Sequence, residues 1–173
     1  MAKKKGGGGS GPNPVKLALK YLDKFKHRPG RGDRMSGKGL RHQQHGELKT
    51  DAETGARVGR GYHSRPGGND FDDRRTTEVT QKHPNGVYSG KVEFKNDNPP
   101  PEWVPKQGDG TSAFFPDDWD SQKIDNATSD AFANGKKDPV TGTWTGTHDG
   151  VKIEGWYDPA TGNIGHGFPS FNQ

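Results

Sequence analysis

The uneven distribution of aromatic side chains is the feature of this sequence that most constrains its fold. Of the 16 aromatic residues, 13 lie after residue 70. Val, Leu, Ile and Phe together make up only about 14% of the chain, below the roughly 20% under which a chain often stays disordered. The formal net charge of +4 is too small for self-repulsion to oppose folding. We therefore expect an ordered domain in the later part of the chain, preceded by a long segment with few core residues.

Charge divides the chain in a similar way. Residues 1–49 carry a net charge of +10, whereas residues 50–173 carry −6. The opening residues include four consecutive glycines followed by Ser, which is typical of a flexible linker. The sequence thus predicts three parts: a flexible linker at 1–14, a basic helix followed by a Gly/Arg-rich loop at 15–39, and the main folded domain at 40–173.

Patterns of apolar residues predict the fold class. An amphipathic helix is predicted at 15–27 and a loop at 28–39, where Gly and Arg are frequent. Alternation of apolar and polar residues predicts strands at 87–94, 143–148, 151–157 and 164–168, and the prolines at 98–105 predict a connector. The pair Asp149-Gly150 is typical of a two-residue hairpin turn, and Asp120 can cap a helix that runs to about residue 133. The order of these elements favours an α+β fold, in which a helix packs on an antiparallel sheet.

Several classes of protein are excluded. No apolar run is long enough to span a membrane, and glycines occupy the place where a signal peptide needs an apolar stretch. The sequence contains no cysteine, which excludes disulfides, thiolate metal sites and a cysteine nucleophile.

Two of the seven histidines stand in polar surroundings rich in glycine. His42 and His63 are therefore expected in loops that present a side chain to a ligand. Two imidazoles can cleave RNA if one removes the proton of the 2′-hydroxyl and the other protonates the leaving 5′-oxygen. This chemistry requires both rings to flank one phosphate, so we expect them to face each other across a cleft. Because such loops contribute little packing, replacing either residue by Ala should change stability by no more than about 1 kcal/mol.

The motifs around these histidines resemble those of a known family. His42-Gln43-Gln44-His45-Gly46-Glu47 is similar to the first active-site motif of EndoU-type endoribonucleases, and Gly61-Tyr62-His63-Ser64 is similar to the second. The bacterial branch, found at the C-termini of polymorphic and contact-dependent inhibition toxins, resembles the chain over roughly residues 40–170. Further similar segments lie at 85–92, 112–119, 150–156 and 162–169. The resemblance implies an EndoU-like nuclease domain at 40–173, with the fold shared by barnase, EndoU, colicin and RelE-type nucleases.

The resemblance also implies a function and a set of site residues. It makes His42, His63 and Lys91 the catalytic residues of an endoribonuclease that needs no metal or other cofactor. Such enzymes cleave single-stranded RNA or tRNA and leave a 2′,3′-cyclic phosphate. His166 and Phe168 stand where many members have a hydroxyl residue and an aromatic residue that bind the base. The implied protein is a monomeric secreted effector, delivered into the cytoplasm of a target cell and blocked by a cognate immunity protein.

Other interpretations of these residues remain open. Lys91 is also compatible with a solvated strand lysine, Lys95 lies on the same face of the strand, and Phe168 is also compatible with core packing. His45 occupies a variable position of the first motif, and its spacing from His42 and Glu47 does not match a zinc site. The whole chain is alternatively a non-catalytic basic RNA-binding or adaptor module. A third interpretation, a hydrolase or structural protein of a secretion apparatus, requires the histidines to be far apart.

Overall fold

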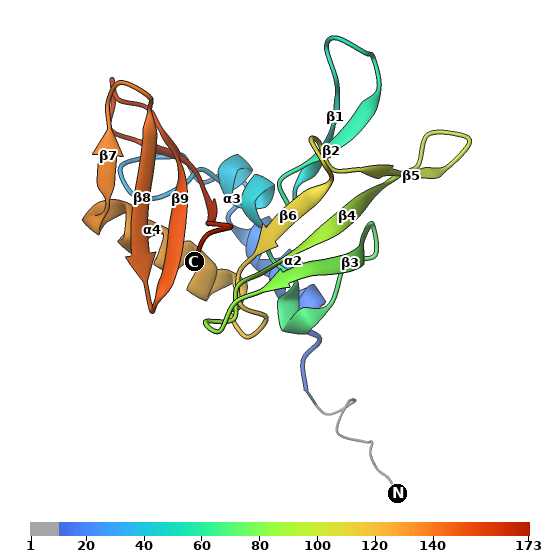
Figure 1. Cartoon of the computed structure of the whole chain (residues 1–173), viewed down its shortest axis with the longest axis horizontal. Helices are drawn as coiled ribbons and strands as arrows, with labels where there is room; N and C mark the ends of the chain where they lie inside the picture. Colours follow the sequence, from blue (N-terminus) through green and yellow to red (C-terminus); the bar gives the residue numbers. More distant parts are fainter. Residues whose placement is uncertain (1–10) are drawn as a thin grey trace, which may run out of the picture.

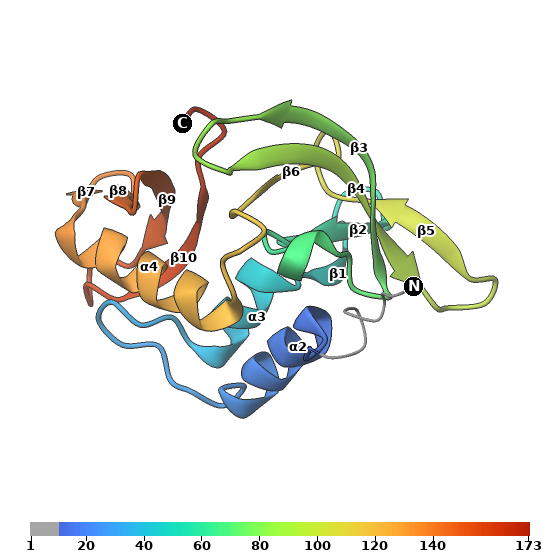
Figure 2. The same ribbon diagram turned by 90° about the horizontal axis from the view of Figure 1, so that it is seen from below.

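The computed structural model of this chain describes residues 11–173 and shows an α+β architecture (Figure 1). The helices of the described part are Pro14–Lys24 (α2), Gly37–Gln44 (α3), Ser121–Asn134 (α4) and a short 3-10 turn, Pro66–Gly68 (η1). They gather along one side of the molecule, with the two larger sheets on the other (Figure 2). The predicted fold class is confirmed. Most of the predicted linker at 1–14 lies outside the described residues.

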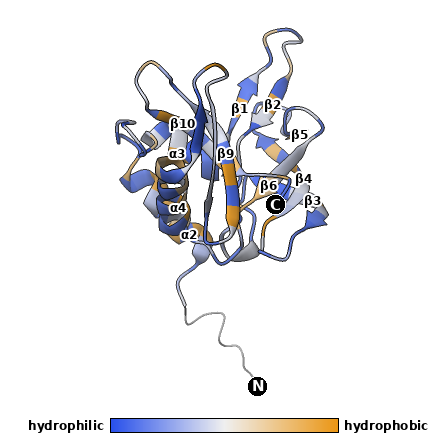
Figure 3. Ribbon diagram, turned by 60° about the vertical axis from the view of Figure 1, so that its left-hand side comes forward, coloured by the Kyte–Doolittle hydropathy of each residue, from blue (hydrophilic) through white to orange (hydrophobic). Residues whose placement is uncertain are grey.

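One sheet is formed by the last four strands. These are Lys136–Asp138 (β7), Thr143–His148 (β8), Val151–Tyr157 (β9) and Ile164–Pro169 (β10), antiparallel in the order β10-β9-β8-β7. Apolar and charged residues alternate along β9 (Figure 3), and its Val151 and Ile153 are buried. Asp149 and Gly150 have φ angles of 48° and 75°, as the predicted hairpin turn requires. This sheet packs against α4, as the sequence predicted.

A second sheet is formed by four strands from the middle of the chain. They are Arg74–Lys82 (β3), Tyr88–Asn96 (β4), Glu102–Pro105 (β5) and Thr111–Phe114 (β6), with β4 pairing with all three of the others. Two further strands, Glu47–Thr50 (β1) and Arg57–Arg60 (β2), form a hairpin that projects from the molecule (Figure 1). The sequence predicted only β4 in this region, and β5 lies in a segment where it predicted a proline-rich connector.

Two hydrophobic cores lie beneath the two larger sheets. Phe114 packs in the core of the middle sheet, and its neighbour Phe115 packs in the core shared by α4 and the last sheet. Helix α2 contributes to both, since Ala18 lies in one core and Leu22 in the other. The predicted basic segment at 15–39 is therefore packed against the rest of the domain.

The predicted loop at 28–39 needs two corrections. Helix α3 begins within it, at Gly37, where a side chain would collide with the carbonyl oxygen of Phe25. Leu40 is the one large apolar residue of α3, and the polar Gln43 and Gln44 are fully buried beside it, so the hydrophobic pattern does not reveal the helix. Arg28, at the start of the predicted loop, is not free in solution but donates two hydrogen bonds to the Asp125 carboxylate of α4. Among the helices of residues 11–173, none has the length and apolar character needed to cross a membrane.

Candidate active site

A cavity of about 560 Å³ brings together most of the residues that the sequence singled out. It lies where α3, the segment after β2, the end of β5, and strands β9 and β10 meet. Its lining consists of His42, Arg60, Gly61, His63, Lys106, Gln107, Gly108, Thr111, Trp156, His166, Phe168 and Phe171. We call it the histidine cavity.

The ring of His166 lies beside the rings of both His42 and His63 in this cavity. The ring of His166 lies 4.5 Å from that of His42 and 5.6 Å from that of His63, measured between centroids. Phe168 stacks on His63 at 5.5 Å, and Trp156 lies parallel to His166 at 5.6 Å. The structure thus brings His42 and His63 into one cavity although they are 21 residues apart in the sequence.

His42 lies on helix α3 and not in the loop that the sequence predicted. Its Nδ1 is 2.9 Å from each carboxylate oxygen of Glu47, at the start of β1. Burial raises the pKa of Glu47, but the hydrogen bond from His42 and the charges of Lys49 and Arg60 outweigh it and hold the pKa below its ordinary value. Glu47 therefore stays ionised and fixes the orientation of the His42 ring.

His63 is held by an unusual backbone and by a backbone carbonyl. The two residues before it, Gly61 and Tyr62, both have left-handed conformations, with φ angles of 78° and 72°. Tyr62 is fully buried and its hydroxyl bonds to Asp70, so the side chain anchors this conformation. The Nδ1–H of His63 donates to the carbonyl oxygen of Ala113 at 2.7 Å, which leaves Nε2 as an acceptor in the neutral ring.

Burial sets the protonation of His63 and His166. It lowers the pKa of His63 well below its ordinary value, and the charges of Lys106 and His166 act in the same direction. It lowers the pKa of His166 to about 3, with further contributions from His42 and Lys106. Both rings are therefore neutral at physiological pH. His166 therefore stays neutral through the physiological pH range.

The lysine of the cavity is Lys106 and not Lys91. Lys106 lies directly after β5, and its Nζ donates to the Ser112 hydroxyl at 2.9 Å. Burial lowers the pKa of Lys106 to about 8. Lys91 lies outside the histidine cavity, where its Nζ donates to the Asp109 carbonyl oxygen at 2.8 Å, and Lys95 pairs with Asp97 at 3.8 Å. No sequence pattern points to Lys106, because this residue lies just after the predicted connector at 98–105.

His45 points away from the histidine cavity. Its Nε2 bonds to Asp73 at 2.8 Å, and its ring packs on Phe71. Across residues 11–173, no three His, Asp or Glu side chains come together as a metal site. The absence of a cofactor remains a prediction.

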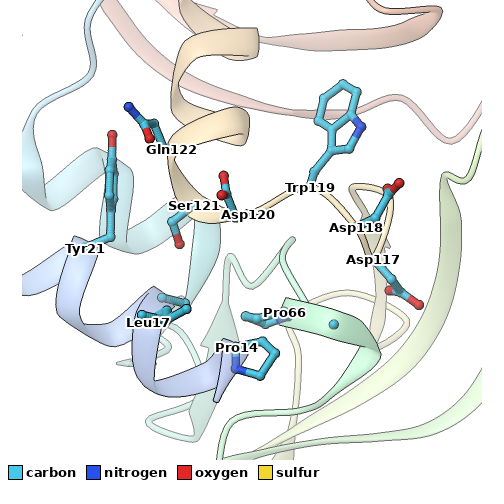
Figure 4. Close-up of a pocket in the computed structure, with 12 residues that line it drawn as sticks. Pro14, Leu17, Tyr21, Pro66, Asp117, Asp118, Trp119, Asp120, Ser121 and Gln122 are labelled. Carbon is cyan, nitrogen blue, oxygen red and sulfur yellow. The ribbon is translucent and has the colours of Figure 1, made fainter. Parts of the chain in front are cut away.

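A second cavity, of about 420 Å³, has the opposite electrostatic character. It lies between α2 and the start of α4, with Pro14, Leu17 and Trp119 among its apolar residues (Figure 4). Three carboxylate residues, Asp117, Asp118 and Asp120, line it together with other residues that carry no positive charge. Such a lining repels the phosphates of RNA, so the histidine cavity is the better candidate for an RNA site.

Comparison with known proteins matches the chain to one family. The sequence model of the family described as bacterial EndoU nuclease matches residues 36–171. This range contains every residue that lines the histidine cavity. No curated protein and no solved structure matches the chain.

Proposed function

Since this chain belongs to the bacterial EndoU nuclease family and is an RNA endonuclease, we propose that it cleaves single-stranded RNA or tRNA in the histidine cavity. The reaction is general acid–base catalysis without a metal ion, and it leaves a 2′,3′-cyclic phosphate. The observation that supports this most strongly is the meeting of His42, His63 and Lys106 in one cavity, although they come from three separate segments.

The partners of the two histidines favour one division of roles. His63 is neutral, and its Nε2 is free to accept a proton because Nδ1 donates to a carbonyl. His63 is therefore the base, which takes the proton of the 2′-hydroxyl as that oxygen attacks phosphorus. We assign the acid to His42, whose Nδ1 is held by the Glu47 carboxylate at 2.9 Å. It gives its proton to the 5′-oxygen as the bond between phosphorus and that oxygen breaks.

Lys106 replaces Lys91 in the proposed mechanism. With a pKa of about 8 it is mostly protonated at neutral pH. Its ammonium group can thus stabilise the negative charge that develops on the phosphoryl oxygens. Ser112 holds it in place: the hydroxyl accepts from Lys106 and donates to the Tyr62 carbonyl oxygen at 2.5 Å.

Aromatic side chains on one flank of the cavity are suited to hold a base. Phe168 is partly buried against His63, and Trp156 is 52% exposed beside His166. We assign base stacking to Phe168 and hydrogen bonding of the base to the neutral His166. Replacing Phe168 by Ala should then raise the KM more than it lowers the kcat.

The resemblance of the sequence to bacterial toxin domains also implies a biological role. We infer that the chain is the toxin domain of a contact-dependent inhibition or related system, secreted and delivered into the cytoplasm of a target cell as a monomer. A cognate immunity protein would block it by covering the histidine cavity. Because the titratable residues of that cavity are neutral or cationic, the partner should present acidic side chains there.

The test is cleavage of tRNA by the purified chain in the presence of EDTA, with the new ends identified chemically. We expect cyclic phosphates from the wild-type chain and almost no cleavage by His42→Ala or His63→Ala. His27→Ala is the matched control, because His27 is exposed and lies outside the cavity. Intact RNA despite measurable binding would support the alternative of a non-catalytic RNA-binding module.

A further inference from the structure

A groove of about 480 Å³ adjoins the histidine cavity. It runs between α3 and the β1–β2 hairpin and shares His42 and Arg60 with the cavity. Its lining consists of Ser36, Lys38, Gly39, Arg41, His42, Glu47, Lys49, Arg60 and Gly165. We call it the side groove.

The side groove is strongly cationic. Four of its nine lining residues are basic, namely Lys38, Arg41, Lys49 and Arg60. Within residues 11–173, none of these four lies within 4.0 Å of a carboxylate oxygen in an ion pair. Glu47 is the one acidic residue of the lining, and both of its oxygens bond to His42. The positive charges are thus available to a ligand.

One guanidinium nitrogen in the side groove is buried without a partner. The Nε of Arg60 is buried and has no hydrogen-bond partner in the described part of the chain. A buried guanidinium nitrogen without an acceptor is costly, and an anion at the junction of the two cavities would supply the acceptor. Arg60 lines both hollows, so an anion bound at their junction would lie beside its guanidinium.

The chemistry of the lining favours phosphates over bases. Apart from the His42 ring, the side groove has no aromatic side chain on which a base could stack. The histidine cavity, in contrast, is lined by Trp156, Phe168 and Phe171. The two neighbouring hollows therefore suit different parts of an RNA strand: bases in the histidine cavity, and the sugar-phosphate backbone in the side groove.

We propose that the side groove binds the backbone phosphates of the nucleotides on one side of the scissile bond. This inference rests on the proposed function of the histidine cavity, and it adds a second site that a minimal dinucleotide does not reach. The enzyme should then prefer longer strands, and the preference should arise from extension on one side only. Because the contacts are to phosphates, it should not depend on the sequence of the added nucleotides.

The test compares three substrates that contain the same cleaved step: the dinucleotide, the dinucleotide extended on its 5′ side, and the dinucleotide extended on its 3′ side. For the wild-type chain, we expect one extension to raise kcat/KM roughly tenfold over the dinucleotide. The double variant Arg41→Ala/Lys49→Ala should lose most of that ratio. Neither residue lines the histidine cavity, and both are exposed, so folding should be little affected.

Binding of a longer, non-cleavable strand gives a second measurement. A deoxynucleotide at the cleaved position prevents the reaction, since the attacking hydroxyl is missing. Loss of two phosphate contacts should reduce the slope of log Kd against log salt concentration by about 1.4 for single-stranded RNA. The control is Lys20→Ala/Lys136→Ala, which removes the same charge from exposed positions outside both cavities.

The outcomes separate this inference from the proposed function. If the groove variant keeps the wild-type ratio and salt slope, or if the control lowers them equally, the side groove does not bind RNA. If the wild-type chain cleaves none of the three substrates, the proposed function fails as well.

Discussion

Lys106 and Lys91 show how much the position of a single ammonium group matters. Lys91 lies within β4 and Lys106 directly follows β5, but Lys106 is half-buried in the histidine cavity and Lys91 is 38% exposed outside it. Replacing Lys106 by Ala should reduce cleavage about 10²- to 10³-fold, because the charge that stabilises the transition state is lost. Lys91→Ala is the matched variant and should cleave nearly as well as the wild type. Single-turnover cleavage of RNA measures both, and the reverse ranking would return the catalytic role to Lys91.

His42 and His63 should differ in what they contribute to stability. Their side chains are both polar, but that of His42 is 29% exposed, whereas His63 is buried and bonds to Ala113. The sequence predicted that replacing either histidine by Ala changes the free energy of unfolding by no more than about 1 kcal/mol, and we keep this expectation for His42. It is revised for His63, where a lost hydrogen bond and a cavity should lower the free energy of unfolding by about 2–3 kcal/mol. Urea unfolding measures this difference, and equal losses in the two Ala variants would contradict it.

At the scale of elements, a buried carboxylate fastens α2 and the following loop to α4. Asp125 accepts two hydrogen bonds from Arg28, at 2.8 and 2.9 Å, and one from the Tyr21 hydroxyl at 2.7 Å. Asp125→Ala leaves these donors without an acceptor, so the free energy of unfolding should fall by about 3 kcal/mol. Asp130→Ala on the same helix is the control, because Asp130 is about half exposed and pairs with His148 at the surface. A loss in urea unfolding no larger than that of the control would show that Asp125 does not fasten these elements.

The sequence predicted those elements whose residues follow a regular apolar pattern. Strands β8 and β9 alternate around Trp144, Val151 and Ile153, and the cap at Asp120 marks the start of α4. Helix α3 escaped prediction because it buries glutamine amides where an amphipathic helix usually buries apolar residues. The motifs around His42 and His63 were sufficient to predict that these residues meet. Lys106 and Arg60 could not be predicted, since their importance depends on which cavity their chain segments reach.

At the scale of the whole molecule, buried histidines should make stability depend on pH. His166 has a pKa of about 3 in the folded chain and an ordinary value of 6.5, so the unfolded chain binds more protons between these values. The contribution of His166 to the free energy of unfolding is therefore fully present above about pH 6.5, and it is lost as the pH falls from there toward 3. At pH 5 the loss from His166 should be about 2 kcal/mol, and His63 should add to it.

Urea unfolding at pH 7.5 and pH 5.0 measures this loss. The difference should shrink by about 2 kcal/mol in His166→Asn, because this variant has no imidazole to protonate at that position. His27→Gln, at an exposed position, should show the same difference as the wild-type chain. A His166→Asn chain that is as sensitive to acid as the wild type would show that His166 is not the group responsible.

The position of β10 in the chain has a consequence for synthesis of the enzyme. His42, His63 and Lys106 are made early, but His166 and Phe168, which complete the cavity around them, belong to the last strand. That strand pairs with β9 and forms one wall of the site, and its buried residues have no sheet to join until β9 exists. A ribosome that has translated the message only as far as α4 therefore carries a chain in which the histidine cavity is not yet assembled. The order of the strands thus delays completion of this cavity until the last strand has been made.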